Sequence, residues 1–285
     1  MLQTIQFIDK SFSNVDIDKY HLSLQVSLKG FSFSILDRDR NKFVAFGHYP
    51  QARVTSYRTL AKQISGIIDG ELALQCAFSH VKVLFATPDY TFVPAEFYAD
   101  SNCDEWYRFN QEPKKDEVIM SNYIYGNSSY VVYGLPQVLM QTMRSRYALA
   151  QFYHQSVPMI EELTLKSKIE NSAKRIYLNM MPAFFDLVFA DGGSILLYNS
   201  FKYQSINDFK YFFLNAVDNL QFSPIESPVY LCGMVSPDGP VIEAVKEYIK
   251  NVNYFVRPSH FDYAYGFDSV PSHYFTNLLN LYQCG

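Results

Sequence analysis

The residues that could do chemistry are few, and none is spaced as a known catalytic or metal motif. His260 and His273 flank an aromatic loop that also holds Asp262 and Asp268, so imidazole and carboxylate ligands for a metal occur together there. Their spacing matches no zinc pattern, because structural zinc sites repeat their ligands at short intervals. The sequence contains no Gly-x-Ser-x-Gly nucleophile elbow and no phosphate-binding P-loop. We therefore assign no catalytic residue and no metal ligand.

The cysteines and the apolar segments favour a cytoplasmic protein. No Cys-x-x-Cys pair occurs among the four cysteines, which is typical of reduced thiols: Cys76, Cys103, Cys232 and Cys284. The first ten residues lack the cationic and apolar regions of a signal peptide. No stretch reaches the roughly 20 apolar residues that a membrane helix requires. We expect a cytoplasmic location without membrane insertion.

Composition excludes several other classes. The 285 residues are 48% hydrophobic and 18% charged, which excludes general disorder and suffices for a core without disulfide bonds. The formal net charge is −4, so the chain has no overall positive field to attract phosphate backbones. We expect no nucleic-acid partner.

The elements near the start of the chain form a recognisable order. Three strands are predicted over residues 22–28, 31–37 and 42–48, and the second alternates apolar with small polar residues. That alternation is typical of a half-buried antiparallel strand. Apolar residues then recur at helical spacing over 57–69, and a buried strand is predicted over 81–86.

The same order recurs later in the chain. Predicted strands cover 175–181, 184–190 and 194–198, followed by a helix over 206–220 and a strand over 229–233. When Phe31 is placed on Phe184, an offset of 153 residues, the three strands of each region superpose without a gap. The order strand, strand, strand, helix, strand thus occurs twice. We predict an α/β protein with mixed sheets, built from two duplicated lobes.

The remaining segments set the predicted domain boundaries. Between the repeats we predict a short helix over 102–109, strands over 117–125 and 130–133, and helices that begin near Pro136 and Ser156. Further helices are predicted in the tail, over 240–252 and 272–282. The first lobe then spans 1–170, with an insert at about 95–133, and the second lobe spans 171–285.

These two tandem lobes resemble the actin-like ATPase fold, whose lobes are ribonuclease-H-like. The likeness lies in the order of elements, in the meander over 185–197, and in a strand that ends in a Pro-containing turn over 84–89. It is closest to the bacterial actin-like cytoplasmic proteins of pilus assembly and type II secretion. The chain is also similar to an uncharacterised domain-of-unknown-function family of Bacteroides-type bacteria, assigned the same fold.

The resemblance implies where a nucleotide would bind between the lobes. Active members hold Mg²⁺ and phosphates at the first turn of each meander, with an Asp beside each turn and paired glycines near the adenosine. Here the first turn has no carboxylate, and Pro182 in the second turn has no N–H group. The residues that the resemblance places at this cleft are Ser27, Lys29, Gly30, Asn179 and Gly233.

The third element, residues 231–236, keeps one glycine, Gly233, where a pair is expected, so all three nucleotide elements are degraded together. Phosphoryl transfer depends on positioned metal and charge. We therefore expect no cofactor, with ATP and Mg²⁺ disfavoured. The sequence favours a protein that is not an enzyme, but it leaves this question open. Asp186 lies beyond the second turn and is expected on an exposed strand face. The alternative is a divergent ATPase or small-molecule kinase that uses Ser27 and Lys29.

Aromatic residues are abundant outside these turns, with 24 Phe, 23 Tyr and 1 Trp. Core packing explains most of them, but interfaces are also enriched in aromatic side chains. We predict a contact surface for a protein partner or a second copy, formed by Trp106, Tyr107, Tyr123, Tyr125, Phe261, Tyr263 and Tyr265. The favoured function is a non-catalytic scaffold or adaptor; a peptidoglycan-binding module has only the aromatics in its support.

Overall fold

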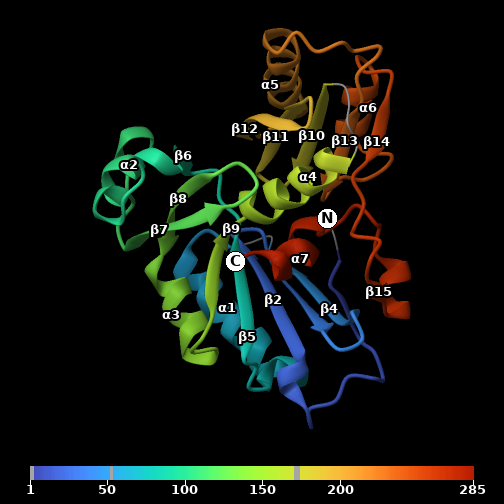
Figure 1. The fold of residues 1–285 in the computed structure, drawn as a ribbon. Coiled ribbons are helices and arrows are strands. Elements are labelled where there is room, and N and C mark those ends of the chain that lie inside the picture. Colours follow the sequence, from blue (N-terminus) through green and yellow to red (C-terminus); the bar gives the residue numbers. More distant parts are fainter. Residues whose placement is uncertain (1–2, 52–53, 170–173) are drawn as a thin grey trace. The chain divides into compact units, whose positions relative to one another are not determined.

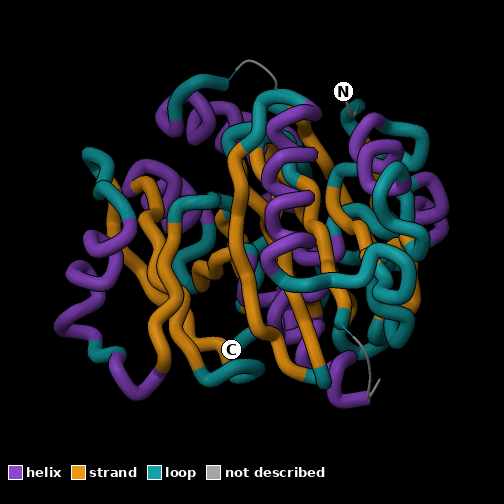
Figure 2. The backbone as a smooth tube through the Cα atoms, turned by 90° about the horizontal axis from the view of Figure 1, so that it is seen from above, coloured by secondary structure: helices purple, strands orange, loops and turns teal. Residues whose placement is uncertain are grey.

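The computed structural model describes residues 3–51, 54–169 and 174–285. The chain forms two compact units. Unit 1 contains residues 1–158, 258–270 and 277–285, and unit 2 contains residues 159–257 and 271–276. In each unit helices lie against a mixed sheet (Figures 1 and 2).

The main sheet of unit 1 has seven strands. Its path runs β1-β4-β3-β2-β5-β9, and β15 pairs with β4. The strands β2, β3 and β4 form an antiparallel meander, whereas β5 and β9 run parallel to β2. The bounds are β1 Ile5–Ile8, β2 Tyr20–Ser27, β3 Gly30–Asp37, β4 Lys42–Pro50, β5 His80–Phe85, β9 Gln151–His154 and β15 Asp262–Tyr263.

The two faces of this sheet differ in chemistry. Along β2, Leu22, Leu24 and Val26 point to one face, and His21, Ser23 and Gln25 point to the other; all six side chains are buried. The apolar face is covered by α1 (Tyr57–Gly70), whose Tyr57 ring packs on Phe85, and α1 contacts α3 (Gln137–Arg146). The polar face is contacted by a 3₁₀ turn over Leu281–Gln283, which follows the short helix α7 (Thr276–Asn280).

The predicted insert is a small three-stranded sheet covered by one helix. The order is β6-β8-β7, with β6 Tyr90–Pro94, β7 Glu117–Ile124 and β8 Ser129–Pro136. The helix α2 (Cys103–Asn110) places Tyr107 against Val93 and Val132, and all three side chains are fully buried. Because the apolar residues of α2 lie on one side, its other side carries charged residues and faces solvent.

Unit 2 has a five-stranded sheet in the order β12-β11-β10-β13-β14. The strands are β10 Arg175–Met180, β11 Phe184–Asp191, β12 Ser194–Lys202, β13 Val229–Gly233 and β14 Val252–Tyr254. Its helices are α5 (Ile206–Asn219), α6 (Pro240–Lys246) and α4 (Ser156–Ile169), whose first three residues belong to unit 1. The core contains Phe185, Phe209 and Phe213, whose rings pack in sequence with centroids 4.9 and 5.7 Å apart.

The predicted duplication is visible in the strand orders. The order β4-β3-β2-β5-β9 of unit 1 matches β12-β11-β10-β13-β14 of unit 2, with the same meander followed by two parallel strands. The gapless superposition is wrong at the first turn. Ser27 pairs with Gly30 across two residues, whereas Met180 pairs with Phe185 across four. The turn of the second meander is therefore two residues longer.

The predicted boundary and tail also need correction. The units divide at residue 158 instead of 170, and two tail segments return to unit 1, where Tyr263 pairs with Phe43. The helix predicted over 240–252 ends at Lys246, because Val252–Tyr254 form β14 beside β13. The helix predicted over 272–282 is reduced to the short turns of α7. The predicted end of α4 near Asn171 lies outside the described residues. Within the described residues, no helix is both long enough and apolar enough to cross a membrane.

Candidate functional site

The first phosphate turn of the actin-like pattern is a tight hairpin at the end of β2. Ser27 is buried and its Oγ donates to the carbonyl of Gly30 at 3.3 Å, while the N–H of Lys29 donates back to the same Oγ at 3.3 Å. The carbonyl of Lys29 accepts from the N–H of Gln51, and the Lys29 side chain is exposed. The Lys29 N–H and Ser27 hydroxyl are thus used within the hairpin.

The glycine of this turn has a packing role. A Cβ atom on Gly30 would lie 3.1 Å from the ring of His48, which is closer than ordinary van der Waals contact. His48 is itself buried, and its Nδ1 lies 2.8 Å from the Oγ of Ser32. Burial lowers the pKa of His48 to about 4, so the ring is neutral near pH 7.

The second turn belongs to unit 2 and follows Asn179 and Met180. The N–H of Met181 donates to the carbonyl of Phe184 at 3.0 Å, and Pro182 has no N–H group. The carbonyl of Met181 accepts from the Tyr203 hydroxyl at 3.2 Å. Within this turn, Pro182 therefore offers no N–H donor and the N–H of Met181 is already hydrogen-bonded. The residue after β12, Tyr203, also binds the turn.

Asp186 is buried, which corrects its predicted exposure. It lies between Asn179 and Ser200 on neighbouring strands, in one rung of the sheet. The Asn179 amide donates to Oδ2 at 2.8 Å, and the Ser200 hydroxyl donates to Oδ1 at 2.5 Å. On the other side of Asn179, the Cys232 thiol lies 3.8 Å from the Oδ1 atom of Asn179. Both oxygens of the carboxylate are thus hydrogen-bonded inside the sheet.

Gly233 ends β13 beside Asn179, so these two predicted residues do lie together. Its φ is +79°, and a Cβ atom there would lie 2.3 Å from the carbonyl oxygen of Met180. Its N–H donates to the carbonyl of His273 at 2.9 Å. The close packing predicted for this glycine is confirmed. Ser27, Lys29 and Gly30 belong to unit 1, whereas Asn179 and Gly233 belong to unit 2.

The predicted aromatic surface is only partly at the surface. Tyr107 and Phe261 are buried, with 0% and 5% of their side chains exposed, because Tyr107 fills the core under α2 and Phe261 packs on Phe43. These two residues are removed from the predicted surface. Trp106 and Tyr263 are half-buried, and Tyr265 is 87% exposed.

Four tyrosines of the insert form one patch, which we name the tyrosine patch: Tyr98, Tyr123, Tyr125 and Tyr130. The rings of Tyr98 and Tyr130 stack with centroids 3.7 Å apart, and the ring of Tyr123 packs on both Tyr125 and Tyr130. Tyr98, Tyr123 and Tyr130 are half-buried and Tyr125 is 69% exposed. Tyr98 belongs to the aromatic cluster that the sequence shows in the insert, whereas Tyr130 was missed, although the alternation of Tyr123 and Tyr125 along one strand was a signal for this face.

Metal ligands do not gather in the described parts of the chain. Over residues 3–51, 54–169 and 174–285, no group of three or more His, Cys, Asp or Glu residues could hold a metal ion. Cys76, Cys103 and Cys232 are free thiols, and burial raises the pKa of Cys232 to about 12, so this thiol is protonated.

Comparison with solved structures identifies the fold. A crystal structure of a Bacteroides thetaiotaomicron protein, described as having an actin-like ATPase fold and unknown function, matches with a TM-score of 0.79 at 21% identity, over 96% of this chain and 99% of that one. The PilM–PilN type IV pilus biogenesis complex matches with a TM-score of 0.62 at 12% identity, over 92% and 97%. The fold is therefore the actin-like ATPase fold, as the resemblance implied.

Comparison of sequences identifies the family. No curated protein matches this chain. The profile of the family described as "Protein of unknown function (DUF3822)" matches residues 9–252. Since this match covers most of the sequence, the chain belongs to the DUF3822 family.

Proposed function

We propose that this protein is a non-catalytic member of the actin-like fold that acts as a cytoplasmic adaptor through protein–protein contacts. The observation that carries the proposal is the state of the Asp186 carboxylate, whose two oxygens accept from Asn179 and Ser200 in the interior of the sheet. Mg²⁺ requires oxygen ligands that are free to face it. The residues at the two turns therefore do not fit Mg-ATP, and no reaction step is assigned to them.

The tyrosine patch supports the second half of the proposal. Rigid tyrosine rings lose little conformational freedom when a partner docks, and they combine apolar area with a hydroxyl that can hydrogen-bond. Strand pairing places Tyr123 opposite Tyr130, and the Tyr98 hydroxyl lies 2.7 Å from the Oγ of Ser121 on β7, so much of the patch is organised before binding. The PilM–PilN structure is a complex of two proteins. By analogy, we propose that this chain also acts by binding a partner protein.

An alternative is a divergent ATPase or small-molecule kinase. Its support is the exposed Lys29 side chain on the first turn, a cation that could reach a phosphate group. Lysine binds phosphate as a point charge without needing a glycine-rich loop. This alternative requires Mg-nucleotide binding that depends on Lys29.

Thermal denaturation of the full chain with Mg-ATP, Mg-GTP and their diphosphates separates the two functions. The adaptor predicts no stabilisation and no release of phosphate. The enzyme predicts a shift, because any ligand that binds only the folded state stabilises it, and this shift is lost in Lys29→Ala. ATP turnover by the pure protein would overturn the adaptor proposal.

The partner is sought with a photo-crosslinking amino acid in place of Tyr125, with the same substitution at Tyr211 on α5, which is similarly exposed, as the matched control. We expect a discrete crosslinked protein at position 125 and none at position 211. The purified partner should then bind the wild type and bind Tyr125→Ala at least about tenfold more weakly, a change of about 1.4 kcal/mol. Equal binding of both proteins would remove the tyrosine patch from the proposal.

A further inference from the structure

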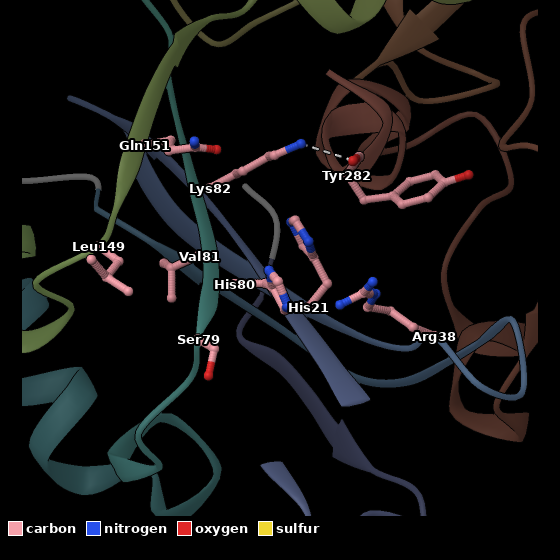
Figure 3. A pocket seen from close by; sticks show the side chains of 9 residues that line it. All are labelled: His21, Arg38, Ser79, His80, Val81, Lys82, Leu149, Gln151 and Tyr282. Atoms are coloured by element: carbon pink, nitrogen blue, oxygen red, sulfur yellow. Dashed lines mark hydrogen bonds between the residues drawn. The ribbon is translucent and has the colours of Figure 1, made fainter. Parts of the chain in front are cut away.

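A cavity of about 600 Å³ opens in unit 1 at the amino-terminal ends of β2, β5 and β9 (Figure 3). Its wall includes His21 at the start of β2, His80 and Lys82 on β5, and Arg38 just after β3. The first phosphate turn lies at the other end of β2. Ser27 lies six positions beyond His21 along the strand, which is about 20 Å. This cavity is therefore distinct from the nucleotide turn of the fold.

Basic groups converge on this cavity. Figure 3 shows the Arg38 side chain directed toward His21 and His80, and the Lys82 side chain directed toward the carbonyl of Tyr282. The imidazoles of His21 and His80 are parallel, with an interplanar angle of 5° and centroids 6.5 Å apart. Lys82 Nζ donates to the carbonyl of Tyr282 at 2.9 Å and to the carbonyl of Cys284, which are neutral acceptors.

Acidic groups are nearly absent from the wall. None of its nine lining residues, all within the described part of the chain, carries a carboxylate. One carboxylate lies at the rim, where Asp18 accepts a hydrogen bond from the hydroxyl of Ser79. The cationic side chains of Arg38 and Lys82 thus face a space whose nine lining residues include no carboxylate, with Asp18 at its rim.

His21 adds an unsatisfied polar group. Only 7% of its side chain is exposed, and its Nε2 has no hydrogen-bond partner. Leaving a buried polar atom unpaired costs roughly 1–3 kcal/mol. Burial, together with the positive charges of Lys82, His80 and Arg38, lowers the pKa of His21 to about 3. The ring is therefore kept neutral chiefly by its burial, and an anion in the cavity would offset the smaller effect of the neighbouring positive charges.

We propose that this cavity binds the phosphate group of a small organic phosphate monoester, with Arg38 and Lys82 neutralising its charge. A phosphate monoester carries about two negative charges at pH 7, which matches the two cations better than a carboxylate does. The volume exceeds that of a phosphate ion and lies in the range of small-molecule sites. The ring of Tyr282, which lies edge-on to the His21 ring, lines the remaining wall and would contact the organic part.

The test is calorimetric titration of the full chain with inorganic phosphate, glycerol 3-phosphate and phenyl phosphate, with glycerol and phenol as uncharged counterparts. No magnesium ion or nucleotide is added, so failure here leaves the adaptor proposal untouched. We expect a monoester to bind at least about tenfold more tightly than its uncharged counterpart. Binding should also move the ring ¹⁵N signals of His21.

Arg38→Ala is the principal variant, because Arg38 is exposed and its loss leaves the Lys82 contacts in place. We expect it to weaken phosphate binding by about tenfold or more. Arg40→Ala removes the same charge two residues away, outside the cavity, and should bind as the wild type does. His21→Gln provides a second variant inside the wall. Equal weakening by Arg38→Ala and Arg40→Ala, or no binding up to about 10 mM, would overturn the proposal.

Discussion

Gly233 lies where the resemblance to actin-like proteins implies a nucleotide-binding glycine, but here the packing of the chain itself requires glycine. Its positive φ is unfavourable for residues with a side chain, and an added methyl group would collide with the Met180 carbonyl. We predict that Gly233→Ala lowers the free energy of unfolding by about 2–4 kcal/mol. Urea denaturation followed by circular dichroism measures this loss.

The matched control for that substitution is Gly66→Ala. Gly66 lies in α1 with open space around the position of a Cβ atom, so alanine there should be neutral or stabilising by up to about 1 kcal/mol. A Gly233→Ala protein as stable as the wild type would show that the end of β13 can shift away from β10.

At the scale of the element, the main sheet of unit 1 is unusual because its second buried face is polar. His48 on β4 contacts Ser32 on β3 within this face. Since burial lowers the pKa of His48 from 6.5 to about 4, the unfolded chain takes up a proton at higher pH than the folded protein does. The stabilising effect of the neutral ring is present above pH 6.5 and is lost progressively as the pH falls toward 4.

We predict that His48→Gln reduces the pH dependence of stability. In the wild type this residue contributes a slope of roughly 1 kcal/mol per pH unit between about pH 6 and 4. Urea denaturation at several pH values should show that slope missing from His48→Gln. The exposed His260 provides the control, and His260→Gln should keep the wild-type slope. Identical slopes in all three proteins would show that His48 is protonated in the folded state at the same pH as in the unfolded chain.

At the scale of the whole molecule, unit 1 is assembled from three separate stretches of chain. Phe267, from the tail, is fully buried and packs on Phe7 at 4.9 Å and Phe46 at 5.6 Å between ring centroids. Removing its ring leaves a cavity that the surrounding strands cannot fill. We therefore predict that Phe267→Ala destabilises the protein by about 3–5 kcal/mol, measured by urea denaturation.

Tyr265, two residues away, is the control for this prediction. Its side chain is almost fully exposed, so Tyr265→Ala should change stability by no more than about 0.5 kcal/mol. If both variants were equally mild, the tail would not form part of the unit 1 core.

Local patterns were sufficient to predict most elements. The helix expected over 57–69 is observed as α1 over Tyr57–Gly70, and both meanders lie within a few residues of their predicted bounds. β1, β6, β14 and β15 were missed, because they have two to five residues and no repeated pattern marks them, whereas the equally short β13 was predicted from its place in the duplicated order. The burial of Asp186 was also missed, although its position among apolar residues of β11 was a signal.

The amino-acid sequence by itself determined the duplicated order of strands and helices, because the periodicity of apolar side chains is a local property of each segment. Only the tertiary structure decided which carboxylate is enclosed, which aromatic rings are exposed, and that the tail completes unit 1. The cavity lined by His21, Arg38, Lys82 and Tyr282 likewise joins segments up to 261 residues apart. Such contacts depend on how strands pair and how the chain returns, and side-chain periodicity within a segment carries no information about either.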